Sequence, residues 1–517
     1  MDILQSNLLH RVNIGDLLGR TAARFPDKAA LIEGDRVLDY TALSAGAARA
    51  AQAFAALGIC HGDRVAFLCR NSGAYVTARL GLALIGAIAV PINVMLRQED
   101  IAVILEDARP SIVIADAGLR SLAAGAGESV RRFQIGGNDA DWPSFEELVE
   151  KAPSDEPQVI VRSDDIATLI YTTGTEAAPK GVMLSHLNHL MALIHLMADI
   201  NLSRNDVVLN DLPLFHIAGT TLLLGTLLLG GTGIVSAAPD ATEILTLTER
   251  HRVTRWTYPP TLFTGLLGHP LFGKPDLSSL KAFTIFGGAV PDKARAAWDA
   301  RCPGLVWHNY WGQSEGTAVG TTSAADRHVS AANAIGRVDF GIAVRVVNEG
   351  REVGPGQVGE LLTRGPAVMH GYWNRPDLTD QTLAGGWLHT GDLGYRDESG
   401  EFYFVDRKKD MIKTGGENVS AAEVETVLAS HPQVAAAAVI GLPDLRWTEA
   451  VTACVVPTTG ANPDPEELVA FCKTRLAGFK VPKTVIIRAS LPLSPAGKLM
   501  KRELKQELLA TAQRAQP

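Results

Sequence analysis

A short loop near residue 175 has the composition of a polyphosphate-binding segment. The run from Tyr171 to Gly181 reads Tyr-Thr-Thr-Gly-Thr-Glu-Ala-Ala-Pro-Lys-Gly, and it follows an apolar stretch, 166–170, that predicts a buried strand. Backbone amides, hydroxyl groups and the charge of Lys180 can all bind phosphate oxygens. The loop differs from the common nucleotide-binding loop because no hydroxyl residue follows the lysine. Alone, such a run is more often a surface turn, so its meaning depends on the rest of the chain.

Four later segments carry further groups suited to nucleotide chemistry. They are Trp311 to Glu315, Thr390 to Asp392, Asp406 to Asp410, and Pro495 to Lys498. A carboxylate can hold Mg²⁺ beside phosphate, and another can accept hydrogen bonds from two ribose hydroxyls. Lysine and arginine can offset the negative charge that two anions bring together. Each segment alone is also compatible with an ordinary turn or a solvated charge.

In order and spacing, these five segments resemble those of the adenylate-forming superfamily. Its members are acyl-CoA synthetases, adenylation domains of peptide synthetases and firefly-type luciferases, and the resemblance runs from about Asn13 to Leu508. It implies a large N-terminal domain, residues 1–408, that binds ATP and the acyl substrate. A small mobile C-terminal domain, residues 409–517, would turn about Lys409. The implied cofactors are ATP, Mg²⁺ and CoA.

The resemblance assigns one set of residues to ATP and magnesium. Glu315 matches the magnesium-contacting glutamate of the family, and Thr175 is a second candidate metal contact. The residues expected at the nucleotide are Thr172, Thr173, Gly174, Thr175, Lys180, Gly288, Ala289, Trp311, Gly312, Asp392 and Arg407. Two interpretations of Trp311 remain open, because its ring could flank adenine or fill the core.

The phosphate loop departs from the commonest family pattern at one place. Glu176 and Ala177 stand where a second Thr-Gly pair is usual. Alanine is conformationally stiffer than glycine, and a glutamate close to phosphate would be repelled. We interpret the change as a subgroup variation in which Glu176 points away, and a disabled site is the alternative.

Two lysines near the C-terminus are assigned to the two halves of the reaction. Lys498 resembles the lysine that bridges the carboxylate and the α-phosphate during adenylation, and Lys413 resembles the lysine used in thioester formation. Gly415 and Gly416 would let a pantetheine arm pass close to the backbone. One small domain cannot present both lysines to one pocket at once, so a rotation about Lys409 is implied.

The acyl pocket is expected to be apolar. His216 occupies the family position that lines the acyl channel, although a structural role is also compatible and no base catalysis is assigned to it. The expected lining segments are 216–221, 258–263, 285–289 and 313–320, in which Glu315 is the charged residue. Such a pocket favours a hydrophobic monocarboxylic acid, either medium-chain aliphatic or aromatic. Arg255 lies nearby in sequence and leaves a dicarboxylic acid open.

Composition narrows the class of protein. With 517 residues the chain is too long for one core, and its net charge of −8 argues against nucleic acid as the main partner. The five cysteines have no metal or disulfide spacing, which fits a reducing compartment. No secretory signal is visible, and the uncharged stretch 217–239 is broken by glycines, so we expect a buried helix and strand in a cytoplasmic protein without a transmembrane segment. Peripheral membrane contact and a homodimer stay possible.

Hydrophobic patterning predicts an α/β fold for the first three hundred or so residues. Near-continuous apolar strands alternate with helices, which is typical of mostly parallel sheets; the strands expected are 65–69, 87–90, 111–115, 207–209, 253–258 and 283–286. After about Gly336 short strands separated by turns predict a small β-barrel-like subdomain. From Lys409 onwards the pattern predicts a compact α+β domain.

Four functions are compatible with these motifs. An ATP-dependent acyl-CoA ligase is favoured by the stretch from Lys413 to Ser420 and by the two-domain length. A stand-alone adenylase that loads a carrier protein would share nearly every motif. A luciferase-like oxygenase has no specific support, and a non-catalytic nucleotide-binding protein would need the departure at Glu176 to be disabling.

Overall fold

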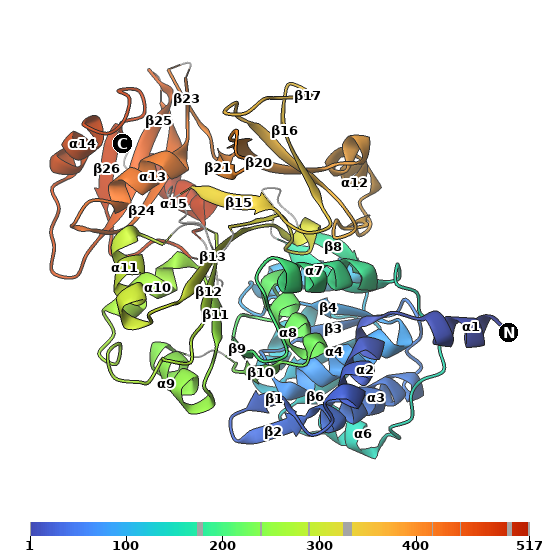
Figure 1. Cartoon of the computed structure of the whole chain (residues 1–517). Helices are drawn as coiled ribbons and strands as arrows, with labels where there is room; N and C mark the ends of the chain where they lie inside the picture. Colours follow the sequence, from blue (N-terminus) through green and yellow to red (C-terminus); the bar gives the residue numbers. More distant parts are fainter. Residues whose placement is uncertain are drawn as a thin grey trace.

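The computed structural model describes residues 2–172, 179–237, 240–287, 290–323, 333–415, 417–444, 446–493 and 499–514. Figure 1 shows a large body made from the first part of the chain and a smaller unit, in red, made from the last part. Two sheets of different size form the body, and a third sheet forms the smaller unit. This arrangement confirms the prediction of an α/β protein with a small C-terminal α+β part.

The smaller sheet of the body has seven strands. Their order is β19 (Gly371–Tyr372), β8 (Lys180–Ser185), β7 (Ile166–Thr172), β4 (Ile88–Pro91), β3 (Arg64–Leu68), β5 (Ile112–Asp116) and β6 (Arg131–Ile135). From β7 to β6 the neighbours are parallel, whereas β8 runs antiparallel to β7 and to β19. The strands are apolar and buried because helices cover both faces, as expected of parallel sheets.

The larger sheet of the body has fourteen strands in one continuous ladder. Their order is β17 (Arg351–Glu352), β16 (Ala343–Asn348), β18 (Gly359–Arg364), β20 (Leu388–Arg396), β21 (Phe402–Arg407), β15 (Ala334–Val338), β14 (Thr321–Thr322), β13 (Val306–Trp311), β12 (Ala282–Phe286), β11 (Arg255–Tyr258), β9 (Val207–Asn210), β10 (Thr232–Val235), β1 (Ala29–Glu33) and β2 (Arg36–Asp39). The strands from β13 to β1 are parallel. The predicted antiparallel subdomain contains β15 to β18, β20 and β21, and its ladder joins the parallel strands through β14.

Helices fill the crossovers between the parallel strands. They are α1 (Ile3–His10), α2 (Ile14–Arg24), α3 (Tyr40–Ala56), α4 (Gly73–Ile85), α5 (Gln98–Ala108), α6 (Phe145–Lys151), α7 (His186–Ala198), α8 (Ile217–Leu229), α9 (Ala241–His251), α10 (Pro260–Leu267) and α11 (Asp292–Arg301), with α12 (Pro376–Thr382) beside β19. Most of α8 is buried, so the uncharged stretch 217–239 is explained as a core helix followed by β10. In the described part of the chain, no helix is long and apolar enough to span a membrane.

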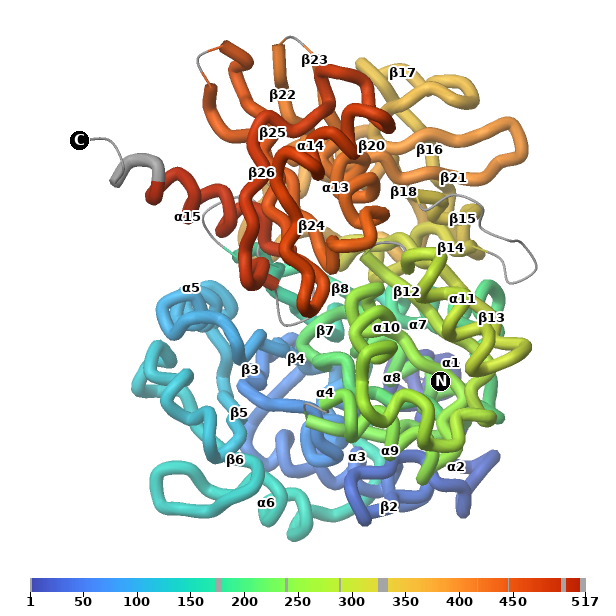
Figure 2. The backbone as a smooth tube through the Cα atoms, turned by 90° about the vertical axis from the view of Figure 1, so that its left-hand side faces the viewer, coloured from blue at the N-terminus to red at the C-terminus, as the bar shows by residue number. Residues whose placement is uncertain are grey.

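The C-terminal unit has a sheet and an apolar core of its own. The sheet contains β22 (Ile412–Thr414), β23 (Glu417–Val419), β24 (Val434–Asp444), β25 (Thr448–Pro457) and β26 (Thr484–Ile487), and its helices are α13 (Ala421–Ala429), α14 (Pro465–Lys473) and α15 (Lys501–Arg514). Its core groups residues such as Val424, Val451 and Leu468. Figure 2 shows this unit above the body, with the β22–β23 hairpin at its outer end.

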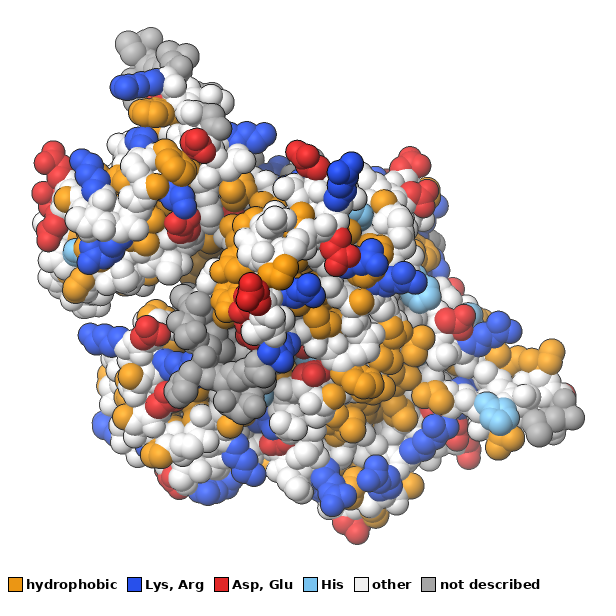
Figure 3. Space-filling model, turned by 45° about the horizontal axis from the view of Figure 1, so that its top comes forward, with side chains coloured by type: hydrophobic (Ala, Val, Ile, Leu, Met, Phe, Trp, Pro, Cys, Tyr) orange, Lys and Arg blue, Asp and Glu red, His pale blue; other side chains and the backbone are white. Residues whose placement is uncertain are grey.

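The chain crosses between the two units in a short segment. Strand β21 ends at Arg407 in the large sheet, and β22 begins at Ile412 in the C-terminal sheet. Contact across the junction is made by the start of α13, where the Ser420 hydroxyl donates to the Val405 carbonyl (2.8 Å) and the Ala422 amide to the Asp406 carboxylate (3.3 Å). Figure 3 shows acidic and basic side chains interspersed over the face formed by both units.

Candidate active site

The two ends of the predicted phosphate loop are held as neighbours in a sheet. Thr172 ends β7 and Lys180 begins β8, and the two residues face each other in the antiparallel register. These two strands, called the hairpin below, therefore fix where the chain leaves the sheet at Thr172 and re-enters it at Lys180. Thr173, Gly174 and Thr175 lie outside the described residues, as do Glu176 and Ala177.

Hydrogen bonds to Asp107 and from Trp373 anchor this hairpin to the surrounding body. The Tyr171 hydroxyl donates to Asp107 Oδ2 on α5 at 2.6 Å, and Asp107 is itself held by the Asn374 side-chain amide, which donates to Oδ1 at 3.2 Å. On the other strand, the Trp373 amide donates to the Gly181 carbonyl at 2.7 Å. Burial and the Asp107 carboxylate raise the pKa of Tyr171, so its hydroxyl keeps its proton and stays a donor. No motif in the sequence indicated this role of Asp107.

Glu315 lies in a short 3-10 turn, Ser314–Gly316, that follows strand β13. Its Oε1 atom accepts a hydrogen bond from the Tyr372 hydroxyl at 2.8 Å, and its carbonyl accepts one from the Met369 amide at 2.8 Å. The ammonium of Lys180 lies 5.6 Å from the centre of the Tyr372 ring. Tyr372 on β19 thus joins the phosphate-loop lysine to the predicted magnesium ligand, and no motif in the sequence singled it out.

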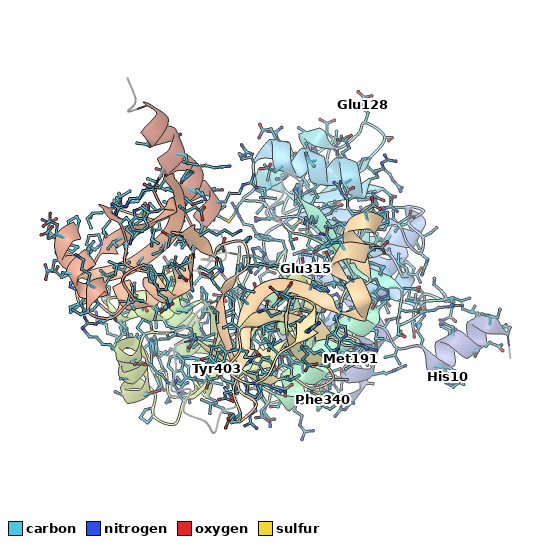
Figure 4. The ribbon with its side chains drawn as sticks, turned by 90° about the horizontal axis from the view of Figure 1, so that it is seen from above. His10, Glu128, Met191, Glu315, Phe340 and Tyr403 are labelled. Carbon is cyan, nitrogen blue, oxygen red and sulfur yellow. The ribbon has the colours of Figure 1, made fainter. Side chains whose placement is uncertain are left out.

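A polar cavity of about 280 Å³ opens beside Glu315. Its lining residues come from four segments of the body: Gln313, Glu315, Glu360, Tyr372, Leu378, Gln381, Thr382, Leu388, His389, Thr390 and Gly391. In the view from above, Glu315 lies near the middle of the molecule, away from the side chains labelled at the periphery (Figure 4). Water-accessible space beside a carboxylate and a nearby lysine fits a hydrated cation and phosphate groups.

The aspartate and arginine predicted at the nucleotide are paired with each other. Asp392 on β20 faces Arg407 on β21 in the register, and the Arg407 Nε atom lies 3.2 Å from Asp392 Oδ1. The Trp311 indole donates to Asp392 Oδ2 at 2.9 Å. Trp311 is buried in the core beside Leu361 and Phe402, which favours the core interpretation of its ring. Its structural contribution is to orient Asp392, and contact of these three residues with a nucleotide stays a prediction.

Two predicted glycine positions lie at the ends of neighbouring parallel strands. Gly312 follows β13, and a Cβ atom there would come within 2.9 Å of the Ala318 backbone, so a side chain would displace the Glu315 turn. Gly287 follows β12 with φ of 76°, a conformation that favours glycine. Gly288 and Ala289 lie outside the described residues.

Glu360 connects the cavity to the segment that leads into the C-terminal unit. Its Oε1 atom accepts from the Gly391 amide at 3.0 Å, and its Oε2 atom lies 3.3 Å from the Lys408 ammonium and 3.8 Å from His389 Nδ1. Lys408 also donates its amide to the Gly391 carbonyl at 2.8 Å. Lys408 is therefore attached to the body, and the exposed Lys409 is the first residue beyond these contacts.

Two of the predicted residues of the C-terminal unit, Lys413 and Gly415, lie on or directly after strand β22 of its outer hairpin. Lys413 is exposed on β22, and its amide donates to Glu449 Oε2 at 2.9 Å. Gly415 has φ of 60°, and its amide donates to the Trp447 carbonyl at 2.8 Å. This hairpin lies away from the body in Figure 2, so the arrangement does not bring Lys413 to Glu315. Gly416 and Lys498 lie outside the described residues.

The expected acyl segments meet in two apolar clusters. Ala218, Leu262 and Phe286 pack against one cluster that also contains Tyr258 and Ile285. The fourth segment joins the first, because Ala318 and Ile217 are in a second cluster. His216 is half-buried at the start of α8, and its ring is tilted against Phe215 with centroids 4.8 Å apart.

Arg255 does not serve this pocket. It begins β11, and Tyr258 at the opposite end of the strand is the residue nearer the acyl segments. Its guanidinium donates to the carbonyls of Ile200 (2.8 Å) and Asn201 (2.7 Å) and lies 3.1 Å from Asp206 Oδ1. These contacts pair the buried guanidinium charge of Arg255, as the burial of a charge requires. The guanidinium is therefore not available to a second carboxylate on the substrate, which was the sequence argument for a dicarboxylic acid.

Family models match both units of the chain. Residues 18–373 match the AMP-binding enzyme model, and residues 423–498 match the model of the AMP-binding enzyme C-terminal domain. The first match covers more than half of the chain and contains the hairpin, Glu315 and the acyl segments. The second match begins beyond the junction and ends at Lys498.

Named relatives span nearly the whole chain. A feruloyl-CoA synthase from Amycolatopsis sp is 37% identical over 94% of this chain and 97% of its own length. The long-chain-fatty-acid–CoA ligase FadD13 of Mycobacterium tuberculosis is 33% identical over 96% of this chain and 99% of its own. The o-succinylbenzoate coenzyme A synthetase MenE of Bacillus subtilis, solved with ATP and a magnesium ion, superposes with a TM-score of 0.83 at 29% identity, over 95% of this chain and 99% of that one. The chain belongs to the AMP-binding enzyme family, in the acyl-CoA synthetase branch of the adenylate-forming superfamily.

Proposed function

We propose that this protein is an ATP-dependent acid–CoA ligase that activates a hydrophobic carboxylic acid. The acid and ATP form an acyl adenylate and pyrophosphate, and CoA then takes the acyl group and releases AMP. The observation that carries the proposal is a cavity lined by Tyr372 and Glu315, with Lys180 beside the Tyr372 ring and the Asp392–Arg407 pair on strands β20 and β21. The names of the relatives, which include aromatic and fatty acid–CoA ligases, support the same reaction.

Glu315 would hold Mg²⁺ together with phosphate oxygens. The Glu315 carboxylate beside a water-accessible cavity suits this ion, which keeps most of its waters and takes few protein ligands. The cation would offset the phosphate charge that the acid must approach. Thr175 is proposed as a second contact, and Thr172, Lys180 and the hairpin amides would donate to the phosphates.

Asp392 and Arg407 would bind the ribose and phosphate side of the nucleotide. The carboxylate is held by Trp311 and Arg407, so it is positioned before a ribose hydroxyl arrives. Preorganised partners of this kind lose little entropy on binding and act fully in the transition state. Gly312, Gly288 and Ala289 would let adenine or the acyl group approach the backbone.

The C-terminal unit would serve the two half-reactions in turn. We propose domains of residues 1–408 and 409–517, with Lys409 as the hinge, because the contacts of Lys408 to the body end immediately before it. Lys498 would stabilise the charge that develops as the acid oxygen attacks the α-phosphorus. After a rotation, Lys413, Gly415 and Gly416 would face the pocket while the CoA thiolate attacks the acyl carbonyl and AMP leaves.

The acid is proposed to be a monocarboxylic acid with a hydrophobic body. Apolar side chains from three expected segments surround Tyr258, and the nearby cation Arg255 is engaged elsewhere. His216 would shape the entrance to this channel beside Phe215. Medium-chain aliphatic and aromatic acids both satisfy this description.

Mass spectrometry of the purified protein with Mg-ATP, CoA and a panel of carboxylic acids tests the proposal. A new acyl-CoA that appears together with AMP supports the ligase and identifies the preferred acid. AMP or bound acyl adenylate without acyl-CoA indicates instead that a carrier protein is the acceptor. If no acid yields AMP while ATP still binds, the catalytic proposal is wrong.

A further inference from the structure

A tyrosine and an aspartate meet at the end of the strands that carry the acyl segments. Strands β9 and β11 are parallel with Arg255 opposite Val208, so Tyr258 and Asp211, each three residues further on, also come opposite each other. On its other side Tyr258 faces Ile285 of β12. Both residues therefore lie at the carboxyl edge of the parallel strands, where α/β sheets bind ligands.

One short hydrogen bond joins Tyr258 and Asp211. The Tyr258 hydroxyl donates to Asp211 Oδ2 at 2.5 Å. Both residues are buried, with exposed fractions of 4% for Tyr258 and 9% for Asp211. Among the described residues, the buried Oδ1 atom of Asp211 accepts no hydrogen bond. A buried acceptor without a donor is costly, so a group that donates to it gains more than it would at the surface.

The pair lies beside a buried apolar cluster to which three of the expected acyl segments contribute. Tyr258 belongs to the apolar cluster against which Ala218, Leu262 and Phe286 pack, one from each of three acyl segments. Leu212, the neighbour of Asp211, belongs to the same cluster. A polar acceptor set into an apolar wall is the arrangement by which pockets orient and select ligands.

No described cation compensates the Asp211 carboxyl. Burial raises its pKa to about 7, against the opposing effects of the Tyr258 hydroxyl and of the Asp211 and Leu212 amides. The acidic Glu243 on α9 raises the pKa further. A second carboxylate on the substrate would add negative charge here, whereas a neutral donor would not. The site therefore favours a hydroxyl group over a distal carboxylate.

We propose that Asp211 and Tyr258 select an acid whose hydrophobic body carries a distal hydroxyl group. The substrate hydroxyl donates to Asp211 Oδ1, and the Tyr258 hydroxyl fixes the orientation of the carboxyl through Oδ2. This inference rests on the proposed ligase function and names its substrate class as hydroxylated monocarboxylic acids. An analogue without the hydroxyl group leaves the Asp211 Oδ1 acceptor unpaired, so the site discriminates against it.

Matched acids that differ by one hydroxyl group test this selection. We would measure kcat/KM for acyl-CoA formation with cinnamate and 4-hydroxycinnamate, and with octanoate and 8-hydroxyoctanoate. In at least one pair the wild type is expected to favour the hydroxylated acid by about tenfold or more. Equal kcat/KM values within both pairs would overturn the inference while leaving the ligase function standing. Absence of AMP with every acid would instead refute the ligase function itself.

Substitutions of Asp211 and Tyr258 test whether the preference for hydroxylated acids depends on this pair. Asp211→Leu removes the acceptor, so it should reduce the preference for the hydroxylated acid to within about threefold of unity while activity with the plain acid persists. Tyr258→Phe should reduce the preference by a smaller factor, because the acceptor stays but loses its orientation. Retention of the full preference in Asp211→Leu would overturn the inference, and if that variant does not fold, retention in Tyr258→Phe decides.

The chain offers a matched control for the loss of a phenol–carboxylate bond. The Tyr403 hydroxyl donates to Asp397 Oδ2 at 3.1 Å, and its ring stacks on Tyr395. In Figure 4 Tyr403 lies apart from Glu315. Tyr403→Phe should leave the preference for hydroxylated acids unchanged. An equal loss of preference in this control would show that the effect of Tyr258→Phe is not local.

Discussion

The proposed nucleotide end and the proposed acyl end of the site differ in how their charged groups are paired. At the proposed nucleotide end, charged groups are held by partners: Glu315 by Tyr372, and Asp392 by Trp311 and Arg407. At the proposed acyl end, Asp211 is buried against Tyr258 of an apolar cluster, and its Oδ1 atom accepts no hydrogen bond from described residues. In the first region the charged groups are positioned before any ligand binds. In the second region one buried acceptor lacks a donor among the described residues, and a ligand would supply it.

This difference separates catalysis from selection. Every acid that the enzyme activates passes through the same charged transition state, and prearranged partners lower its free energy by the same amount for each. Selection among acids depends on contacts that differ between them, and a buried unpaired acceptor discriminates more strongly than apolar contact does. Substitutions at the nucleotide end should therefore lower the rate with every acid, whereas substitutions at the acyl end should change the preference among acids.

The largest effects are expected at the two C-terminal lysines. Lys498→Ala should lower acyl-AMP formation by on the order of a hundredfold or more, because a preorganised cation is lost, and should spare thioester formation from supplied acyl adenylate. Lys413→Ala should show the reverse bias. Single-turnover measurements of each half-reaction check both. Equal loss of both half-reactions in either variant would contradict the assignment of that lysine and the alternation model.

Glu315→Gln should be nearly as damaging, but only at the nucleotide end. Loss of the carboxylate charge should lower kcat/KM by about a hundredfold and raise the Mg²⁺ concentration needed for half-maximal rate, because the ligand to the cation is weakened. The preference among acids should not change. Tyr372→Phe, which removes the hydrogen bond to Glu315 and leaves its carboxylate in place, is the matched milder variant. A Glu315→Gln enzyme with an unaltered Mg²⁺ requirement would refute the metal assignment.

Asp107→Asn should have a moderate effect on ATP. Asp107 accepts a hydrogen bond from the Tyr171 hydroxyl on β7, close to where the predicted phosphate loop begins. Because asparagine is a weaker acceptor, the substitution should loosen the loop and raise the KM for ATP by roughly tenfold. The KM for the acid should stay within about twofold. Asp100→Asn, on the same helix in an exposed pair with Arg97, is the control. Equal changes in both KM values would indicate a general disturbance rather than a loosened loop.

The last prediction concerns folding stability rather than activity, and its sign follows from Asp211. Burial raises the pKa of this carboxyl to about 7 in the folded state, above its unfolded value, so the folded state binds the extra proton. Its contribution is fully present below the unfolded pKa and is lost as pH rises to about 7, at about 1.4 kcal/mol per pH unit. Relative to Asp211→Leu, the wild type should become less stable between pH 5 and pH 7 in denaturant titrations. A stability difference that does not change with pH would contradict the raised pKa.

Local patterns predicted the parallel strands and their helices closely. The expected strand at 65–69 corresponds to β3 (Arg64–Leu68), and the expected strand at 283–286 lies within β12 (Ala282–Phe286). The pattern of a buried strand is contained in a short stretch of sequence, which is why sequence and structure agree here. The segment 390–392, which alone is compatible with an ordinary turn, lies within strand β20 (Leu388–Arg396). Pairing with β18 and β21 overrides that local preference.

The sequence by itself determined which residues are suited to the chemistry and in what order they come. Only the tertiary structure decided which of them meet: Tyr372 with Glu315, Trp311 with Asp392, and Tyr258 with Asp211. These partners are separated by 57, 81 and 47 residues, and no local pattern encodes such contacts. They arise because strand register and apolar burial bring distant segments to the same edge of a sheet. The free-energy cost of burying a polar group depends on the whole core around it. That cost would make the Tyr258–Asp211 pair select a ligand that donates a hydrogen bond.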